Sequence, residues 1–226
     1  MGRITLPEAL QAARLMVFDF DGTLVDSNEI KWKGFEATFL DFPDQLEEIL
    51  KYCRGSNHTP RDEKFRHVSE AILGRPYTTE MAERLHERFR SVTTEAIVNA
   101  HEIPGAGEFL KCSKAHCETA VLSSTPHAVL IDILEKRGWT DLFDQFQGAP
   151  VDKKAWLLEL REDRGLPSAE IVFFGDTPED AAAAREAGCR FVAVANDDLN
   201  SDADCFLRDF DGAPALLGGS VPDANS

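Results

Sequence analysis

Val-Phe-Asp-Phe-Asp-Gly-Thr-Leu-Val-Asp-Ser, residues 17–27, is the segment from which the architecture can be worked out. Its first two residues continue an apolar run that starts at residue 15, and the run 15–18 is typical of a buried parallel strand. Asp19 and Asp21 stand where this strand stops, and Gly22 then permits a turn. Two carboxylates in that position add no stability, because desolvation and mutual repulsion both raise the free energy of the charged forms. We therefore expect a cation there, and a divalent metal ion together with a phosphate group is the best candidate.

The rest of the chain consists of a helical segment followed by alternating strand and helix patterns. Residues 28–98 have apolar residues at helical spacing, separated by proline and glycine, and include no convincing strand. Beyond Pro104 we expect strands at 119–123, 171–174 and 191–194, a short strand or turn at 143–148, helices near 105–116, 126–137, 153–164 and 178–187, and a weak strand–helix pair near 204–217.

Alternation of this kind predicts an α/β fold with a doubly wound, Rossmann-like parallel sheet. In such a fold the functional site lies at the carboxyl ends of the strands. We assign residues 1–26 and 100–226 to this catalytic core. Residues 27–99 are assigned to an inserted all-helical cap, which we expect to cover the same edge of the sheet as a lid.

Composition limits the classes of partner and the compartment. The net charge of −16 disfavours nucleic acid, and no apolar run approaches the roughly 20 residues that span a bilayer. The first residues lack the apolar core of a signal peptide. The five cysteines form no Cys-x-x-Cys pair, and their odd number argues against a complete disulfide framework. We expect a cytoplasmic protein without membrane contact, in which Cys112, His116 and Cys117 form either a metal site or simply one helix face.

Three later segments place polar side chains at the same edge of the predicted sheet. Ser123 and Ser124 follow the second strand, where hydroxyls and backbone N–H groups at a helix start suit a phosphate oxygen, although such a cluster also serves as an N-cap. Asp176 follows the strand at 171–174, and Asp180 comes one helical turn later, although acids are favoured in the first turn of any helix. Lys153 begins a helix, a position where its charge opposes the helix dipole.

These pieces occur in the order Asp-x-Asp-Gly-Thr, Ser, Lys and Gly-Asp-x-x-x-Asp. The set resembles the motifs of the haloacid dehalogenase superfamily of hydrolases, over nearly the whole chain. Small helical caps of the C1 type occur in that superfamily where this chain has its helical insert. The resemblance implies a phosphatase-like enzyme that uses Mg²⁺.

The resemblance also implies a role for each motif residue. Asp19 would be the nucleophile and form an aspartyl-phosphate, and Asp21 would be the general acid and base. Ser123 and the amide of Ser124 would hold the phosphoryl group, whose charge Lys153 would neutralise. Mg²⁺ would be held by the acidic residues of the first and last motifs: Asp19, Asp21 through its backbone carbonyl, Asp176 and, in a supporting role, Asp180.

The chemistry of phosphate esters agrees with these roles and narrows the reaction. A phosphate monoester is a dianion, so an anionic nucleophile needs positive charge at the site before it can approach. Mg²⁺ prefers oxygen ligands such as carboxylates and phosphate. An acid two residues after the nucleophile can protonate the leaving oxygen and later activate water. Family members that cleave carbon–halogen or phosphonate bonds lack that acid, so Asp21 favours hydrolysis of a small phosphorylated metabolite.

Three alternatives stay open. A sugar phosphomutase of the same superfamily usually has a histidine five residues after the acid that corresponds to Asp26, and this chain has Lys31 there. A non-catalytic binding protein on this scaffold would usually have lost a motif residue, and none is lost here. Lys154 adjoins Lys153 and could be the lysine that neutralises the phosphate.

A basic segment in the predicted cap is a candidate specificity site. Residues 51–67 hold five basic and two acidic residues, and small caps of this family place a specificity loop at the turn formed by residues 55–56. Arg54, His58 and Arg61 could bind a carboxylate or a second phosphate of the leaving group, or else form salt bridges between cap and core. The sequence thus predicts an acidic phosphorylated substrate without identifying the metabolite or the oligomeric state.

Overall fold

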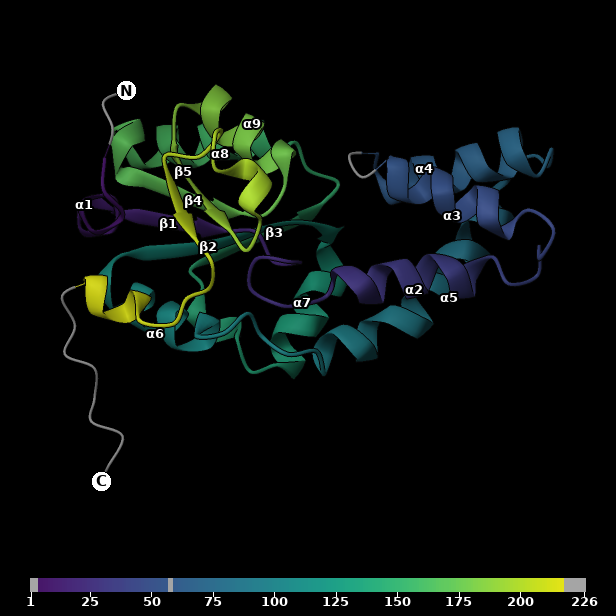
Figure 1. Cartoon of the computed structure of the whole chain (residues 1–226), viewed down its shortest axis with the longest axis horizontal. Helices are drawn as coiled ribbons and strands as arrows, with labels where there is room; N and C mark the ends of the chain where they lie inside the picture. Colours follow the sequence, from purple (N-terminus) through teal and green to yellow (C-terminus); the bar gives the residue numbers. More distant parts are fainter. Residues whose placement is uncertain (1–3, 57–58, 218–226) are drawn as a thin grey trace. The chain divides into compact units, whose positions relative to one another are not determined.

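The computed structural model describes residues 4–56 and 59–217, and these divide into two compact units (Figure 1). The first unit combines the residues before Ser27 with those after Ala100, and the second unit, called the helical unit below, is the segment Ser27–Ala100. Each unit has its own hydrophobic core. The role of the inserted segment as a cap stays a prediction.

The first unit contains a six-stranded parallel sheet, in the order β3-β2-β1-β4-β5-β6. Its strands are β1 (Leu15–Phe18), β2 (Glu118–Pro126), β3 (Gln145–Ala149), β4 (Ile171–Gly175), β5 (Arg190–Val194) and β6 (Cys205–Leu207). β1 pairs with β2 on one side and with β4 on the other, so the strand order reverses between β1 and β4. At such a switch point the loops after the two strands leave in opposite directions, and a ligand crevice forms at the carboxyl ends. The predicted doubly wound sheet is confirmed.

Helices cover both faces of this sheet (Figure 1). Leu15 and Val17 of β1 pack on one face with α8 (Lys153–Arg164) and α9 (Pro178–Ala187). On the other face lie α6 (Ala106–His116) and α7 (His127–Lys136), and the ring centroids of Phe18 and Phe109 are 6.1 Å apart there. Because successive side chains of a strand point to opposite faces, a strand covered on both faces is apolar throughout. This explains the continuous apolar run of β1.

The structure differs from the sequence-based prediction at three places. The chain begins with α1 (Leu6–Ala12), which was not expected and which a capping box between Thr5 and Glu8 stabilises. β2 continues to Pro126 instead of ending at residue 123. The helix expected near the end of the chain is only a 3₁₀ turn, Ala213–Leu217.

The second unit is a helical bundle. It comprises α2 (Asn28–Thr38), α3 (Leu46–Gly55), α4 (Arg61–His67), a π-helical turn (Val68–Ile72) and α5 (Thr79–Val98). Its core is largely aromatic, and the buried rings are those of Phe35, Phe39, Phe65 and Phe89. Gly34 lets α2 approach α5 closely, because a Cβ there would lie 2.4 Å from Cγ2 of Thr93.

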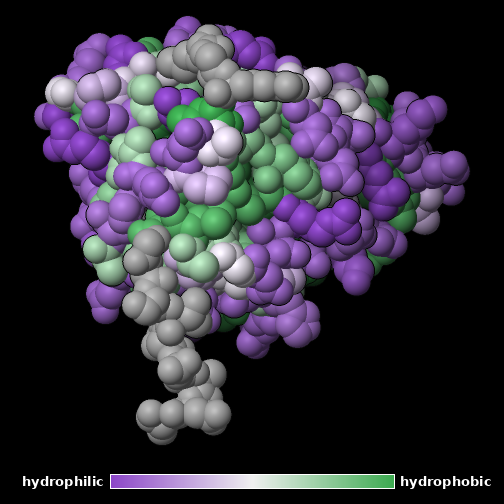
Figure 2. Space-filling view, turned by 60° about the vertical axis from the view of Figure 1, so that its left-hand side comes forward, coloured by the Kyte–Doolittle hydropathy of each residue, from purple (hydrophilic) through white to green (hydrophobic). Residues whose placement is uncertain are grey.

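The surface is mostly polar. Figure 2 shows a face on which hydrophilic side chains predominate and hydrophobic side chains gather in a patch near the middle. Among the described residues, the exposed large hydrophobic side chains are Leu40 and Val92. No helix in the described part of the chain is long and apolar enough to cross a membrane.

Two glycines with positive φ provide a matched test of core packing. Gly105 (φ 77°) precedes α6, and a Cβ there would lie 2.7 Å from the carbonyl carbon of Phe210, whereas Gly138 (φ 68°) has open space around it. Alanine at either position costs about 1–2 kcal/mol for the left-handed backbone. We expect Gly105→Ala to lower the free energy of unfolding by at least about 1 kcal/mol more than Gly138→Ala, because the backbone at Phe210 must also shift. Urea unfolding measures both, and equal losses would contradict the predicted clash.

Candidate active site

Two buried carboxylates follow β1. Asp19 and Asp21 are each 5% exposed. The Asp19 N–H donates to the carbonyl oxygen of Phe174 in β4 at 2.8 Å, so the pairing with β4 extends to the first acid. The chain then turns at Gly22, whose φ is 84° and whose N–H donates to the carbonyl oxygen of Val25 at 2.8 Å. The strand thus fixes Asp19, and the turn redirects the chain directly after Asp21.

Hydroxyl groups from the end of β2 contact the second acid. Thr125 Oγ1 donates to Asp21 Oδ2 at 2.8 Å, and Ser123 Oγ donates to the same oxygen at 3.4 Å. The Thr125 N–H in turn donates to Ser123 Oγ at 3.0 Å. Because β2 continues past Ser123, its side chains alternate: Ser123 and Thr125 are buried and Ser124 is exposed. The hydroxyl of Ser124 therefore does not join those of its neighbours.

Two further acids come from the segment after β4. Asp176 lies in the loop and Asp180 in the first turn of α9, where Asp180 is fully buried. Thr177 caps this helix, and its Oγ1 donates to Asp180 Oδ2 at 2.6 Å. Gly175 makes room for the turn, because a Cβ there would lie only 2.5 Å from the Cβ of Asp180. The capping box therefore occupies one oxygen of Asp180 and directs the other toward β1.

Lys153, at the start of α8, joins these acids. Its Nζ lies 2.7 Å from Oδ1 of Asp19 and 2.7 Å from Oδ1 of Asp180, and its side chain is 13% exposed. Lys154, the alternative drawn from the sequence, is exposed and pairs with Glu186 at 2.8 Å. Of the two lysines, it is thus Lys153 that contacts the predicted nucleophile.

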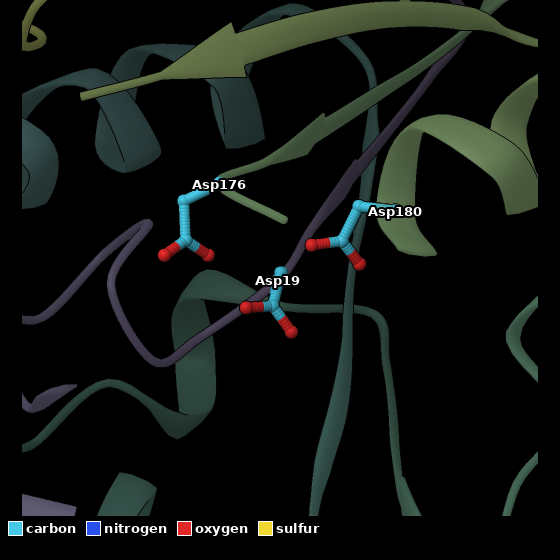
Figure 3. Close-up of side chains that lie close together, drawn as sticks. All are labelled: Asp19, Asp176 and Asp180. Atoms are coloured by element: carbon cyan, nitrogen blue, oxygen red, sulfur yellow. The ribbon is translucent and has the colours of Figure 1, made fainter. Parts of the chain in front are cut away.

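Asp19, Asp176 and Asp180 bring their carboxylates together (Figure 3). One oxygen of each lies within 4.8 Å of the others, and within the described ranges this is the group whose potential metal ligands converge. The cysteines and histidine at 112–117 form no such group. An all-oxygen set of mostly buried carboxylates fits a hard cation such as Mg²⁺ better than a thiolate-preferring metal.

The electrostatics of the cluster favour an additional positive charge. Burial raises the pKa of Asp19 to about 8, Lys153 opposes this shift, and the carboxylates of Asp180 and Asp176 add to it. Burial lowers the pKa of Lys153, but Asp180 and Asp19 together hold it above its ordinary value. Lys153 therefore stays charged without fully offsetting the acids. A divalent cation beside Asp19 would favour its ionised form, which is the form that can act as a nucleophile.

The residues predicted for substrate specificity lie in the helical unit. Arg54, at the end of α3, is exposed. Arg61 begins α4 and is partly buried, with its guanidinium 4.6 Å from the centre of the Phe89 ring. His58 lies outside the described residues. The role of these residues in specificity stays a prediction.

Three polar contacts at the site were not predicted from the sequence. Thr125 contacts Asp21 as described above. Thr23 Oγ1 donates to Asp176 Oδ1 at 3.3 Å, and Asn196 Nδ2 donates to the backbone carbonyl of Asp176 at 2.8 Å. Thr23 belongs to the first motif, so its position in the sequence already pointed to the site. Thr125 could have been identified only by extending the predicted strand to Pro126, because Thr125 then lies on the same face of the strand as Ser123. Asn196 carries no comparable signal in the sequence.

Comparison with known proteins is consistent with this geometry. The profile of the family described as haloacid dehalogenase-like hydrolase matches residues 16–194. Phosphoglycolate phosphatase 1 of Pseudomonas aeruginosa is 25% identical over 199 residues, which cover 82% of this chain and 71% of that protein.

Solved structures share the fold. A protein described as a predicted phosphoglycolate phosphatase from Haemophilus somnus has a TM-score of 0.70 at 22% identity, over 91% of this chain and 98% of that one. CbbY from Rhodobacter sphaeroides, solved in complex with xylulose-(1,5)bisphosphate, has a TM-score of 0.69 at 18% identity, over 88% of this chain and 95% of that one.

The carboxylate cluster predicts that Mg²⁺ stabilises the protein. Saturating Mg²⁺ should raise the melting temperature by roughly 5–10 °C, since a ligand at 100 times its dissociation constant adds about 2.7 kcal/mol. Asp176→Asn should lose at least half of this shift, because one ligand loses its charge. Glu159→Gln, which removes an exposed acid of α8, is the matched control and should keep the full shift. Equal shifts in all three proteins, measured by scanning calorimetry, would argue against a metal site at Asp176.

Proposed function

The chain belongs to the haloacid dehalogenase-like hydrolase family, and we propose that it is a Mg²⁺-dependent phosphatase acting on a small phosphate monoester through an aspartyl-phosphate on Asp19. The observation that carries this proposal is the contact of Lys153 with Asp19, beside the converging carboxylates of Asp176 and Asp180. A buried carboxylate with a lysine and an oxygen-rich cation site next to it is suited to receive a phosphoryl group.

The first half of the proposed reaction transfers the phosphoryl group to the enzyme. A carboxylate oxygen of Asp19 attacks phosphorus, and the bond between phosphorus and the leaving oxygen breaks. Asp21 gives its proton to that oxygen, which departs as an alcohol. Ser123, the amide of Ser124 and Lys153 bind the phosphoryl oxygens. Mg²⁺, held by Asp19, Asp176 and the backbone carbonyl of Asp21 with support from Asp180, would offset the negative charge that nucleophile and phosphate bring together.

The second half returns the enzyme to its starting state. Asp21, now a carboxylate, takes a proton from water, whose oxygen attacks the phosphorus of the aspartyl-phosphate. The bond between Asp19 and phosphorus breaks, and inorganic phosphate leaves. The same acid therefore serves both steps. Thr125 donates to Oδ2 of Asp21 and thereby orients this acid for both steps.

The substrate that we propose is a small acidic phosphate ester. The basic segment around Arg54 and Arg61 supports a negatively charged leaving group. The relative from Pseudomonas aeruginosa is named a phosphoglycolate phosphatase, which makes 2-phosphoglycolate the first compound to test. We assign the helical unit Ser27–Ala100 the role of a substrate-selecting cap. A cytoplasmic location belongs to the same proposal, and the five free cysteines are compatible with a reducing compartment.

Hydrolysis is preferred over phosphoryl transfer between sugars. Lys31 stands where mutases of the family usually carry a histidine. In a protein that only binds a partner, the carboxylates clustered around Asp19 would destabilise the fold without serving catalysis, since like charges are desolvated there. This argues against the non-catalytic alternative.

The proposal predicts Mg²⁺-dependent release of phosphate from p-nitrophenyl phosphate and 2-phosphoglycolate. Asp19→Asn should lower kcat by at least about a thousandfold, because the amide cannot serve as the nucleophile. Chelation of Mg²⁺ should abolish the activity, and renewed addition should restore it. Glu159→Gln serves as control and should retain full activity. A wild-type protein inert on a broad panel of phosphate esters would overturn the proposal, whereas a bisphosphate-activated interconversion of sugar phosphates would favour the mutase.

Thr125 provides a test of the role given to Asp21. Thr125→Val keeps the side-chain shape and removes the hydroxyl that orients the acid. We expect kcat on 2-phosphoglycolate, whose alkoxide must be protonated as it leaves, to fall by about tenfold or more. The loss on p-nitrophenyl phosphate should be clearly smaller, because nitrophenolate leaves without a proton.

Thr125→Ser is the matched variant, since it keeps the hydroxyl and should recover most of the lost activity. A purely structural role of Thr125 would reduce the turnover of both substrates equally, and such a result would refute the positioning role.

A further inference from the structure

Asp176 differs from the other two acids of the carboxylate cluster in the backbone that carries it. Asp19 continues the pairing of β1 with β4, and Asp180 lies in the first turn of α9. Asp176 lies in the short loop between β4 and α9, yet its carboxylate is directed toward the other two (Figure 3). A loop residue depends on its surroundings to keep its place, because it is outside the regular hydrogen bonds of strands and helices. The contacts of Asp176 therefore decide where this carboxylate lies.

The loops that follow the two neighbouring strands both contact Asp176. β4 lies between β1 and β5 in the sheet. From the turn after β1, Thr23 Oγ1 donates to Asp176 Oδ1 at 3.3 Å, which is long for a hydroxyl donor. From the loop after β5, Asn196 Nδ2 donates to the backbone carbonyl of Asp176 at 2.8 Å, a favourable length for an N–H donor. The contact from Asn196 is thus the better hydrogen bond of the two, and it acts on the backbone.

The side chain of Asn196 uses both ends of its amide. While Nδ2 donates to Asp176, Oδ1 accepts the N–H of Asp198 at 3.2 Å and caps the 3₁₀ turn Asp197–Leu199. A carbonyl oxygen only accepts and an N–H only donates, so these two partners fix the orientation of the amide. Aspartate at this position would lack the donor, and serine would be too short to reach both partners. The position therefore requires asparagine in particular.

The backbone before Asn196 adopts an unfavourable conformation. Ala195 has a φ of 55°, in the left-handed region that a Cβ disfavours. Its N–H still donates to the carbonyl oxygen of Leu207 at 2.9 Å, so the pairing of β5 with β6 extends to this residue. The chain turns there, and the next residue contacts the loop after β4. Conformations of this kind persist only where surrounding contacts hold them, and they cluster at functional sites.

We propose that Asn196 is a positioning residue of the Mg²⁺ site, which holds the loop after β4 so that the carboxylate of Asp176 is in place before the ion binds. This inference rests on the proposed function and adds a residue to it. Mg²⁺ requires a nearly ideal octahedral arrangement of its ligands, so a ligand that must first be ordered weakens binding. Residues that orient a metal ligand typically contribute about 10–100-fold to metal affinity.

Three variants separate the amide donor from the capping oxygen. Asn196→Ser removes the amide that reaches Asp176 and keeps an oxygen suited to cap the turn, whereas Asn196→Ala removes both. Asn200→Ser changes an exposed asparagine directly after the same turn and is the matched control. We expect both variants of Asn196 to weaken Mg²⁺ binding by about tenfold or more, and Asn200→Ser to leave it unchanged.

The measurement is the rise in melting temperature with Mg²⁺ concentration, followed by scanning calorimetry without substrate. At about 100 times the wild-type dissociation constant, a tenfold loss of affinity leaves about half of the wild-type rise. Without Mg²⁺, Asn196→Ser should melt at a higher temperature than Asn196→Ala, because it keeps the cap. A wild-type response to Mg²⁺ in Asn196→Ser would overturn the inference, even if Asn196→Ala responds less, since the cap alone would then account for the effect.

Because no turnover is measured, this test is distinct from that of the proposed function. A wild type that binds Mg²⁺ but hydrolyses no phosphate ester would refute the phosphatase, and the variants of Asn196 would still decide on the positioning role. A wild type whose melting temperature does not respond to Mg²⁺ would overturn both.

Activity gives a second readout of the positioning role. Asn196→Ser should raise the Mg²⁺ concentration for half-maximal activity by about tenfold or more, while kcat at saturating Mg²⁺ falls much less. A merely structural role would lower kcat without moving the half-maximal Mg²⁺ concentration, and that result would contradict the inference.

Discussion

Lys153 Nζ lies 2.7 Å from the carboxylates of both Asp19 and Asp180, and the arrangement of the first unit depends on this contact. The acids come from β1 and α9, far apart in the sequence, and burial makes their repulsion expensive. The lysine can reach both only if α8 starts at the carboxyl edge of the sheet. Asp152 caps that helix by accepting the N–H of Ala155 at 3.0 Å, which offsets the unfavourable position of a cation at a helix start.

The sequence predicted the central part of the fold well and the ends of the chain less well. β1 and β4 are buried on both faces, so their apolar runs are unambiguous, and Thr177 with Pro178 marks the start of α9 clearly. Helix α1 has only 7 residues, too few to show a clear helical periodicity in the sequence. Its capping box stabilises it nevertheless. At the end of β2, Pro126 suggested an earlier helix start, but the strand continues to that residue. Local signals at a strand-to-helix junction cannot separate these two outcomes.

The same junction explains what the sequence could and could not predict of the site. Acidic residues at strand ends can be recognised in the sequence, because they directly follow apolar runs at positions where a buried charge does not stabilise the fold. A hydroxyl such as that of Thr125 gives no such interruption, since serine and threonine are common before a helix. Its contact with Asp21 follows only once the length of β2 is known. The contact of Asn196 with Asp176 depends on the loop after β5 and has no local signal at all.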